Sequence, residues 1–399
     1  MTRRALVVGA GIGGLAAALA LARQGLGVDV FERAPALQEF GAGLQLTPNA
    51  TRALARLGAL AAARQVAAAP RAVRVLRGAD GAELARLPVE GAERRWGAPY
   101  LAVHRVDLHR ALAEAAAATG SVALHFGAEV VSVASDAQAA SIGVKRGAVS
   151  LRESGEAVVG ADGLRSLVRA RLGRGEADAP RFSYRVAFRA AVEAEWVAPR
   201  WRDNEVTLRL GPRAHLVHYP LRGGSIVNLV AVIESSWRGA VAPVGAGDDP
   251  WDGEADREAL DRAFRDWSVD ARDLIAAPKR WRAWPLMLRP PLDRYVYGRI
   301  ALIGDAAHPM TPFLAQGAAQ AIEDAEALAR RLGQMDNVEA ALAAYSHDRV
   351  ARANRVQREA KMQGRIYHLS GPFAFARDLT MRALGPEGVL KRLDWLYAA

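Results

Sequence analysis

Glycines near the N-terminus are spaced as Gly9-x-Gly11-x-x-Gly14, with one more at Gly13. In this spacing a tight turn brings backbone N–H groups and the start of a helix against a pyrophosphate, and the small residues allow close approach. Glu32 follows 18 residues after Gly14, where a carboxylate can bind the diol of a ribose. The pattern predicts a dinucleotide site, which NAD and FAD would both fit.

A second carboxylate, Asp305, follows the apolar segment 299–303 in the last third of the chain. We interpret this segment as a buried strand that brings Asp305 to the other end of the same cofactor. The combination of the glycine turn with this distant carboxylate favours FAD over NAD. A flavin performs redox chemistry by itself, so the pair predicts an enzyme whose cofactor carries the reaction.

A candidate substrate strand covers residues 214–220 and contains two histidines and a tyrosine. In a strand, alternate residues share a face, so His215 and Tyr219 would point to one side and His218 to the other. We predict that His215 and Tyr219 line one pocket, where they bind or deprotonate a phenol. The alternative is a half-exposed pair that only packs.

The segments around the glycines have the strand–turn–helix–strand order that a nucleotide site requires. A strand is expected over 4–8, a helix over 15–24 and a second strand over 28–32. Further along, we expect helices over 50–69 and 107–118, a hairpin at 71–76 and 82–88, and antiparallel strands within 121–134 and 142–160.

The pattern changes after residue 180. Strand-like segments separated by Gly, Pro and Asn predict a second sheet, over 182–193, 205–210, 214–220 and 225–234. A loop over 239–253 and helices over 254–276, 316–332, 337–365 and 385–398 are expected to complete the chain. The nucleotide-binding unit is therefore predicted to be discontinuous, with the second sheet inserted into it.

Three further motifs resemble those of the single-component (group A) flavoprotein aromatic hydroxylases. They are Gly160-Ala161-Asp162-Gly163-Leu164-Arg165-Ser166, Gly304-Asp305-Ala306-Ala307-His308-Pro309, and Gln316-Gly317-Ala318 followed by Ala321-Ile322-Glu323-Asp324-Ala325. The resemblance covers essentially the whole chain. Its ending, residues 390–397, is similar to the salicylate hydroxylase and 3-hydroxybenzoate 6-hydroxylase branch.

The resemblance implies the para-hydroxybenzoate hydroxylase fold. This is an α/β fold in which a Rossmann-type FAD-binding domain carries an inserted mixed β-sheet substrate domain and C-terminal helices. The expected division gives 1–70, 97–180 and 281–365 to the FAD-binding domain, 71–96 and 181–280 to the substrate domain, and 366–399 to a C-terminal helical segment.

The resemblance also implies residue roles. Asp305 would accept hydrogen bonds from the ribityl hydroxyls, and Gly317 and Ala318 would face the flavin N1–C2=O, where reduction places negative charge. The full set of implied FAD contacts is Gly9, Gly11, Gly13, Gly14, Glu32, Arg33, Gly43, Leu44, Gln45, Arg105, Asp162, Asp305, Pro312, Gly317 and Ala318.

Five positions have less direct interpretations. Asp162 would also contact the nicotinamide nucleotide. Arg165 and Arg169 either form a solvated helix face or receive the phosphates of NAD(P)H. His308 is interpreted as structural. Phe313 is apolar where some relatives carry a polar substrate ligand, which leaves the substrate open.

The implied reaction is hydroxylation of a small aromatic acid, such as a salicylate, hydroxybenzoate or hydroxynicotinate, with NADH or NADPH and O2. In the family it proceeds through a flavin C4a-hydroperoxide, and a base makes the phenol a better nucleophile. Two alternatives stay open: a flavin-dependent epoxidase or reductase of a non-aromatic substrate, and a non-catalytic flavin-binding protein.

Composition narrows the remaining classes. The net charge of +10 is spread along the chain without a basic block, which argues against a nucleic-acid partner. No apolar run reaches membrane-spanning length, and no signal peptide is recognised. Cysteine is absent, which excludes a thiolate metal site. We expect no other metal site. We expect a cytoplasmic monomer or homodimer without a membrane partner.

Overall fold

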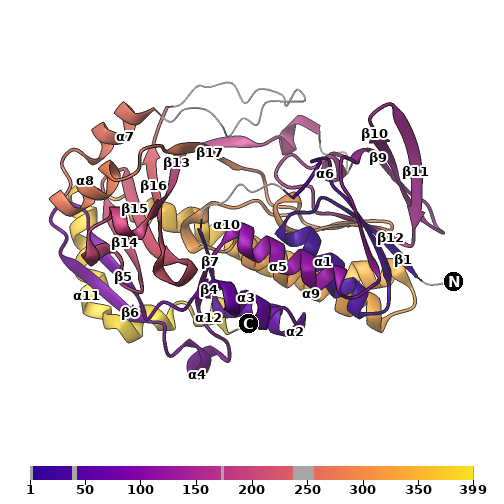
Figure 1. The fold of residues 1–399 in the computed structure, drawn as a ribbon, viewed down its shortest axis with the longest axis horizontal. Coiled ribbons are helices and arrows are strands. Elements are labelled where there is room, and N and C mark those ends of the chain that lie inside the picture. Colours follow the sequence, from indigo (N-terminus) through magenta and orange to yellow (C-terminus); the bar gives the residue numbers. More distant parts are fainter. Residues whose placement is uncertain (1–2, 38–42, 172–174, 237–255, 399) are drawn as a thin grey trace.

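A computed structural model describes residues 3–37, 43–171, 175–236 and 256–398. The chain is built around two large sheets with long helices between and beside them (Figure 1). The predicted α/β class with parallel and antiparallel sheets is confirmed. The loop expected over 239–253 lies outside the described residues. Among the helices that the structure describes, none is both long and apolar enough to cross a membrane.

The first large sheet has the strand order β18-β19-β12-β1-β2-β8. Its strands are β1 (Arg4–Val8), β2 (Gly27–Phe31), β8 (Val122–His125), β12 (Ala157–Gly160), β18 (Val296–Tyr297) and β19 (Ile300–Leu302). All pairings are parallel except that of β18 with β19. The expected strands 4–8 and 28–32 and the return of segment 299–303 to the same sheet are thus observed.

The antiparallel assignment of 121–134 and 142–160 was wrong at both ends. Only β9 (Glu129–Ser135), β10 (Ala140–Arg146) and β11 (Val149–Gly155) form an antiparallel sheet. β8 and β12 belong to the parallel sheet, where every residue of β12 is buried. A continuously buried apolar strand is typical of a parallel sheet covered on both faces. The alternating pattern of the preceding strands led us to assign β12 to the antiparallel sheet with them.

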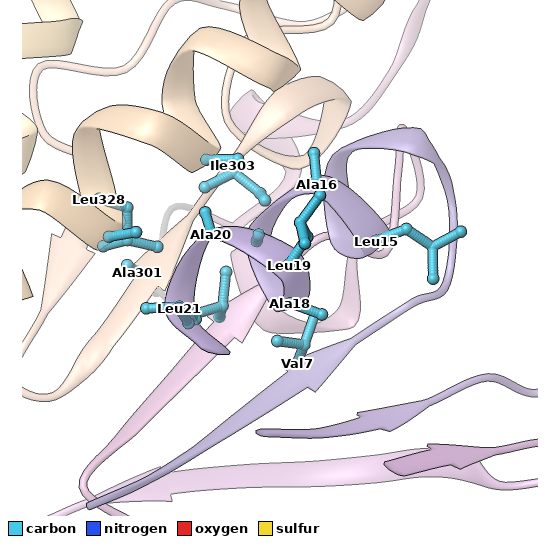
Figure 2. Close-up of a cluster of buried hydrophobic side chains, with 14 of the residues drawn as sticks. Val7, Leu15, Ala16, Ala18, Leu19, Ala20, Leu21, Ala301, Ile303 and Leu328 are labelled. Carbon is cyan, nitrogen blue, oxygen red and sulfur yellow. The ribbon is translucent and has the colours of Figure 1, made fainter. Parts of the chain in front are cut away.

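The helices that cover the parallel sheet include α1 (Ile12–Arg23), α5 (Arg105–Ala117), α9 (Gly317–Gln334) and α10 (Val338–Tyr367). Helix α1 is apolar nearly all round and buries ten of its residues. Figure 2 shows side chains of α1 beside Val7, Ile303 and Leu328, all in one core cluster. This core fixes the starts of α1 and α9 near the sheet.

Three expected helices are interrupted. The helix over 50–69 is α2 (Pro48–Arg56) and α3 (Leu60–Val66), separated at Gly58, whose φ of 69° is left-handed. The helix over 254–276 is α7 (Arg257–Phe264) and α8 (Val269–Ala276), because Ser268 caps a new N-terminus. At the C-terminus, α11 (Gly371–Lys391), kinked at Gly385, precedes α12 (Asp394–Tyr397).

The second large sheet is mixed and has the order β17-β13-β16-β15-β14-β5-β6. Its strands are β5 (Ala72–Arg77), β6 (Glu83–Pro88), β13 (Arg181–Glu193), β14 (Glu205–Gly211), β15 (Ala214–Leu221), β16 (Ile226–Glu234) and β17 (Arg282–Leu288). The early hairpin β5–β6 joins it through the parallel pairing of β5 with β14. β17 also belongs to this sheet, beyond the expected boundary at 280; the full domain division stays a prediction.

A small sheet of β3 (Gly43–Leu46), β7 (Leu101–His104) and β4 (Ala67–Ala68) makes contact with β15. The remaining described elements are short: α4 (Ala92–Trp96), α6 (Leu167–Ala170), and the 3-10 turns η1 (Gly175–Asp178), η2 (Ala194–Trp196), η3 (Pro199–Trp201), η4 (Arg222–Gly224), η5 (Gly304–Ala306) and η6 (Pro312–Leu314).

Candidate active site

Four motifs meet at the carboxyl ends of four neighbouring parallel strands. β2 ends before Glu32, β1 before the glycine turn, β12 before Asp162, and β19 before Asp305. In parallel sheets, ligands bind at this edge. The sheet order β19-β12-β1-β2 therefore places residues almost three hundred positions apart in sequence along a single line, as one elongated cofactor requires.

The glycine turn leaves space for a ligand at Gly11 but no space for a side chain at Gly14. Gly9 has φ 98°, and a Cβ on Gly14 would lie 1.9 Å from the Gly9 carbonyl oxygen, so a side chain at Gly14 cannot fit. At Gly11, in contrast, a Cβ would meet no protein atom within 4 Å. Gly11 precedes α1 without a side-chain cap, so the first N–H groups of that helix are left for a ligand.

The two predicted carboxylates differ in their surroundings. Glu32 accepts hydrogen bonds from the N–H groups of Ala10 and Ala34, both at 2.9 Å, which holds it against the glycine turn. Asp305 is exposed, yet desolvation raises its pKa against the opposing charges of His308 and Arg105. None of the described residues hydrogen-bonds the Asp305 carboxylate, so its oxygens are available to a ligand.

A second helix start lies close to the first. α9 begins at Gly317, whose preceding residue gives no side-chain cap, and a Cβ at Gly317 would meet nothing within 4 Å. A Cβ at Gly13 of α1 would lie 3.2 Å from the Cβ of Ala321 of α9. Two uncapped helix N-termini thus converge near the same edge, a favourable environment for a cofactor that bears negative charge. The described residues fit FAD at this edge.

The remaining residues of the implied FAD set lie on other elements. Gly43, Leu44 and Gln45 form β3, where the Gly43 N–H donates to Asn228 of the second sheet at 2.7 Å. Pro312 opens η6, just before α9. Ala318 is in the first turn of α9, and Arg33 and Arg105 are exposed.

The Asp-Gly motif stabilises the turn in which it lies. The Asp162 carboxylate accepts from Ser166 Oγ at 2.6 Å and from the Val168 N–H at 3.1 Å, so it holds the turn into α6. Its Cα would lie 3.2 Å from a Cβ on Gly9. The motif therefore packs directly on the glycine turn.

Neither alternative for Arg169 was right. Arg169 is buried, pairs with Asp178, and donates to the Ala307 carbonyl at 2.8 Å in the loop after Asp305. Arg289 donates to the same aspartate at 2.7 Å. This cluster ties the Asp-Gly motif to the loop that carries Asp305. Arg165 remains exposed.

The strand register of β15 confirms the predicted alternation of its side chains. His215, Val217 and Tyr219 lie on one side, and His218 on the other side pairs with Arg209 at 2.9 Å. His215 packs edge-on against Phe313 with ring centroids 5.3 Å apart. A Cβ on Gly43 would lie 2.5 Å from the Tyr219 ring. Both side chains thus contact segments that the sequence places beside the flavin.

The electrostatics of this face keep both groups uncharged. Burial, with the positive charges around it, holds the pKa of His215 well below its usual range. Its Nδ1 lies 2.8 Å from Nε2 of His368, whose pKa is lowered to about 4, chiefly by burial. Burial raises the pKa of Tyr219. A neutral imidazole can accept a proton, and a protonated phenol can donate a hydrogen bond.

Sequence reasoning missed the residues that hold these loops. Asp324 accepts from the Gly304 N–H at 2.9 Å, from His308 at 2.6 Å and from Arg349 at 2.7 Å. The structural interpretation of His308 agrees with this contact. Asp324 belongs to a motif identified from the sequence. Arg349 lies in the middle of α10, where no sequence motif indicates its role.

The comparisons with known proteins agree with this geometry. The family model described as "FAD binding domain" matches residues 2–360. The 3-hydroxybenzoate 6-hydroxylase of Polaromonas naphthalenivorans (strain CJ2) is 36% identical over 395 residues, covering 98% of this chain and 95% of its own length. The 3-hydroxybenzoate 6-hydroxylase 1 of Aquipseudomonas alcaligenes is 38% identical over 399 residues, covering 100% and 98%.

A solved structure is similar over almost the whole chain. Klebsiella pneumoniae HpxO, complexed with FAD and uric acid, superimposes with a TM-score of 0.84 at 26% identity, covering 98% of this chain and 95% of its own. The chain belongs to the FAD-binding domain family. Within it, the chain is an FAD-dependent aromatic hydroxylase of the salicylate hydroxylase and 3-hydroxybenzoate 6-hydroxylase branch, as the sequence motifs predicted.

Replacing Asp305 by alanine should weaken FAD binding about ten- to hundredfold, because a hydrogen bond to a charged group contributes about 1.5–3 kcal/mol. Titration of the apoprotein with FAD, followed by quenching of flavin fluorescence, measures this. Asp80→Ala is the control, since Asp80 lies in the β5–β6 turn, bonded to Arg77. An unchanged FAD affinity in Asp305→Ala would remove Asp305 from the cofactor site.

Proposed function

We propose that the protein hydroxylates a small aromatic acid that carries a phenolic hydroxyl, with 3-hydroxybenzoate as the first substrate to test. NADH or NADPH supplies the electrons and O2 the oxygen atom. The observation that carries the proposal is the face of β15, where His215 and Tyr219 contact the segments at Phe313 and Gly43. The names of the similar hydroxylases support the substrate class.

The bound flavin supplies the redox and oxygen chemistry. In this proposal the Nδ1–H of His215 donates to Nε2 of His368, and the Nδ1–H of His368 donates to Glu234. Nε2 of His215 then carries no proton and accepts the proton of the phenol. Loss of that proton makes the ring a better nucleophile. Tyr219 stays protonated and orients the substrate oxygen. The buried ring cluster around His215, which includes Phe313 and Tyr367, excludes water from the reacting ring.

The defining experiment uses the FAD-loaded protein, NADH or NADPH, and 18O2, with hydroxybenzoates and hydroxynicotinates as substrates. One labelled oxygen atom should appear in the aromatic product, and the aromatic acid should accelerate oxidation of the nicotinamide. If label appears only in water or hydrogen peroxide for every aromatic acid, the chain acts as an oxidase or reductase instead. Absence of any nicotinamide oxidation would favour a non-catalytic flavin-binding protein.

A further inference from the structure

Arg189 places a positive charge on the same face of the mixed sheet as the β15 pair. In the register, Arg189 of β13 lies opposite Val230 of β16, which lies opposite Val217 of β15. Directly opposite residues share a face, so Arg189 lies on the side of His215 and Tyr219. Its backbone is two strand spacings, about 10 Å, from β15, a distance that a long arginine side chain can largely cross.

The guanidinium of Arg189 has no anionic partner among the described residues. Its Nε is buried without a hydrogen-bond partner. The guanidinium carbon lies 5.3 Å from the centroid of the Trp284 ring. Burial, and the like charge of Arg105, lower the pKa of Arg189, although the residue as a whole is only half-buried. The guanidinium end is therefore more enclosed than the side chain as a whole.

Two other buried arginines have matched charges, whereas Arg209, like Arg189, has a buried Nε without a hydrogen-bond partner. Arg169 pairs with Asp178, and Arg349 pairs with Asp324 and Glu323. A desolvated cation without a counter-charge destabilises a fold. A ligand that brings an anion to the Arg189 guanidinium would remove that penalty. The planar guanidinium is the side chain best suited to grip a carboxylate through two parallel hydrogen bonds.

We propose that Arg189 binds the carboxylate of the aromatic substrate, while Tyr219 and His215 hold its phenol end. The inference rests on the proposed function, because it takes an aromatic acid as the ligand. The charge of Arg189 acts on Tyr219, whose phenol it favours in the ionised form against the larger effect of burial. Both groups lie on one face of the sheet, two strands apart, so the spacing between them would select for ring size and substitution pattern.

The test compares 3-hydroxybenzoate with its neutral analogue 3-hydroxybenzamide. FAD-loaded protein is titrated with each compound, and the change in flavin absorbance gives the dissociation constant. Arg189→Met should weaken binding of the acid about ten- to hundredfold, the loss expected for a charge-assisted pair, and should leave the amide little changed. Arg189→Lys should retain part of the acid preference, since it keeps the charge without the planar fork.

Arg209→Met is the matched control. Arg209 is another buried arginine of the same sheet, on the opposite face beside His218, so its loss should not change the preference for acid over amide. Without an acid present, Arg189→Met should be at least as thermostable as the wild type, because an unpaired buried charge has been removed.

Two results would overturn the inference. One is an unchanged preference for the acid in Arg189→Met. The other is a weakened affinity for FAD by the same factor, which would make the flavin nucleotide the anion that Arg189 binds. Failure of the proposed function has a different signature: the wild type would form no labelled product from any aromatic acid, whatever the binding preference of the variants.

Discussion

Replacing His215 by alanine should lower the rate of hydroxylation by about 10²–10⁴, the usual loss when a general base is removed, while FAD content stays at the wild-type level. The reason is positional. His215 is buried on the face that meets Phe313, whereas the glycine turn, Glu32 and Asp305 belong to the other sheet. Single-turnover rates of product formation and the flavin absorbance of purified protein measure the two quantities.

Tyr219→Phe should also slow hydroxylation without loss of FAD, because it removes one hydroxyl and keeps the ring that packs against β3. His218→Ala is the internal control, since His218 lies on the opposite face with Arg209. Should His218→Ala abolish product formation while His215→Ala and Tyr219→Phe retain it, the substrate would lie on the other face of β15, and the pocket assignment would be wrong.

Replacing Arg349 by methionine should produce the largest loss of stability, about 3–5 kcal/mol, because it leaves the carboxylates of Glu323 and Asp324 buried with fewer partners. Arg349 is itself buried and joins α10 to α9 through both of them. Thermal unfolding of the FAD-loaded variant and the wild type gives the comparison. FAD retention should fall as well, because Asp324 anchors the Gly304 N–H next to Asp305.

The matched control is Arg331→Met. Arg331 joins the same two helices through Asp348, but on the surface, where ion pairs contribute little. The transition of this variant should stay close to that of the wild type. Equal losses in Arg331→Met and Arg349→Met would contradict the buried pair as the source of stability.

Acidification offers a second readout of this cluster. Burial alone would raise the pKa of Asp324, but His308 and Arg349 lower it to about 2. A carboxyl whose pKa is lower in the folded state contributes stability above its ordinary pKa of about 4, and that stability is lost as the pH falls towards 2. In Arg349→Met the pKa should rise, so the variant should unfold at a higher pH during acid titration.

The cofactor motifs could be predicted from local sequence, because each depends on a short stretch of backbone. A glycine turn between a buried strand and a helix, or a carboxylate at the end of a strand, is set by neighbours a few residues away. The same holds for the parity of His215 and Tyr219, which follows from the two-residue repeat of a strand. These predictions agree with the observed elements.

Strand direction and element breaks needed more than local pattern. The apolar residues of β8 and β12 are spaced much like those of the neighbouring antiparallel strands. Only the pairing of β8 with β2 and of β12 with β1 shows that they belong to the parallel sheet. The breaks at Gly58 and Ser268 each depend on a single residue inside a long segment that otherwise favours a helix. Propensity averaged over a long window underestimates one capping or left-handed residue.

The sequence by itself determined the cofactor class, the family and the side of β15 that carries His215 and Tyr219. The tertiary structure alone decided which charges are matched. Arg169 is paired by Asp178 and Arg349 by Asp324, whereas Arg189 lacks an anion among the described residues. The physical reason is that the strength of an ion pair depends on the distance between its two charges and on their burial. Both quantities are set by residues far apart in the chain, so the sequence does not show whether an arginine has an anionic partner.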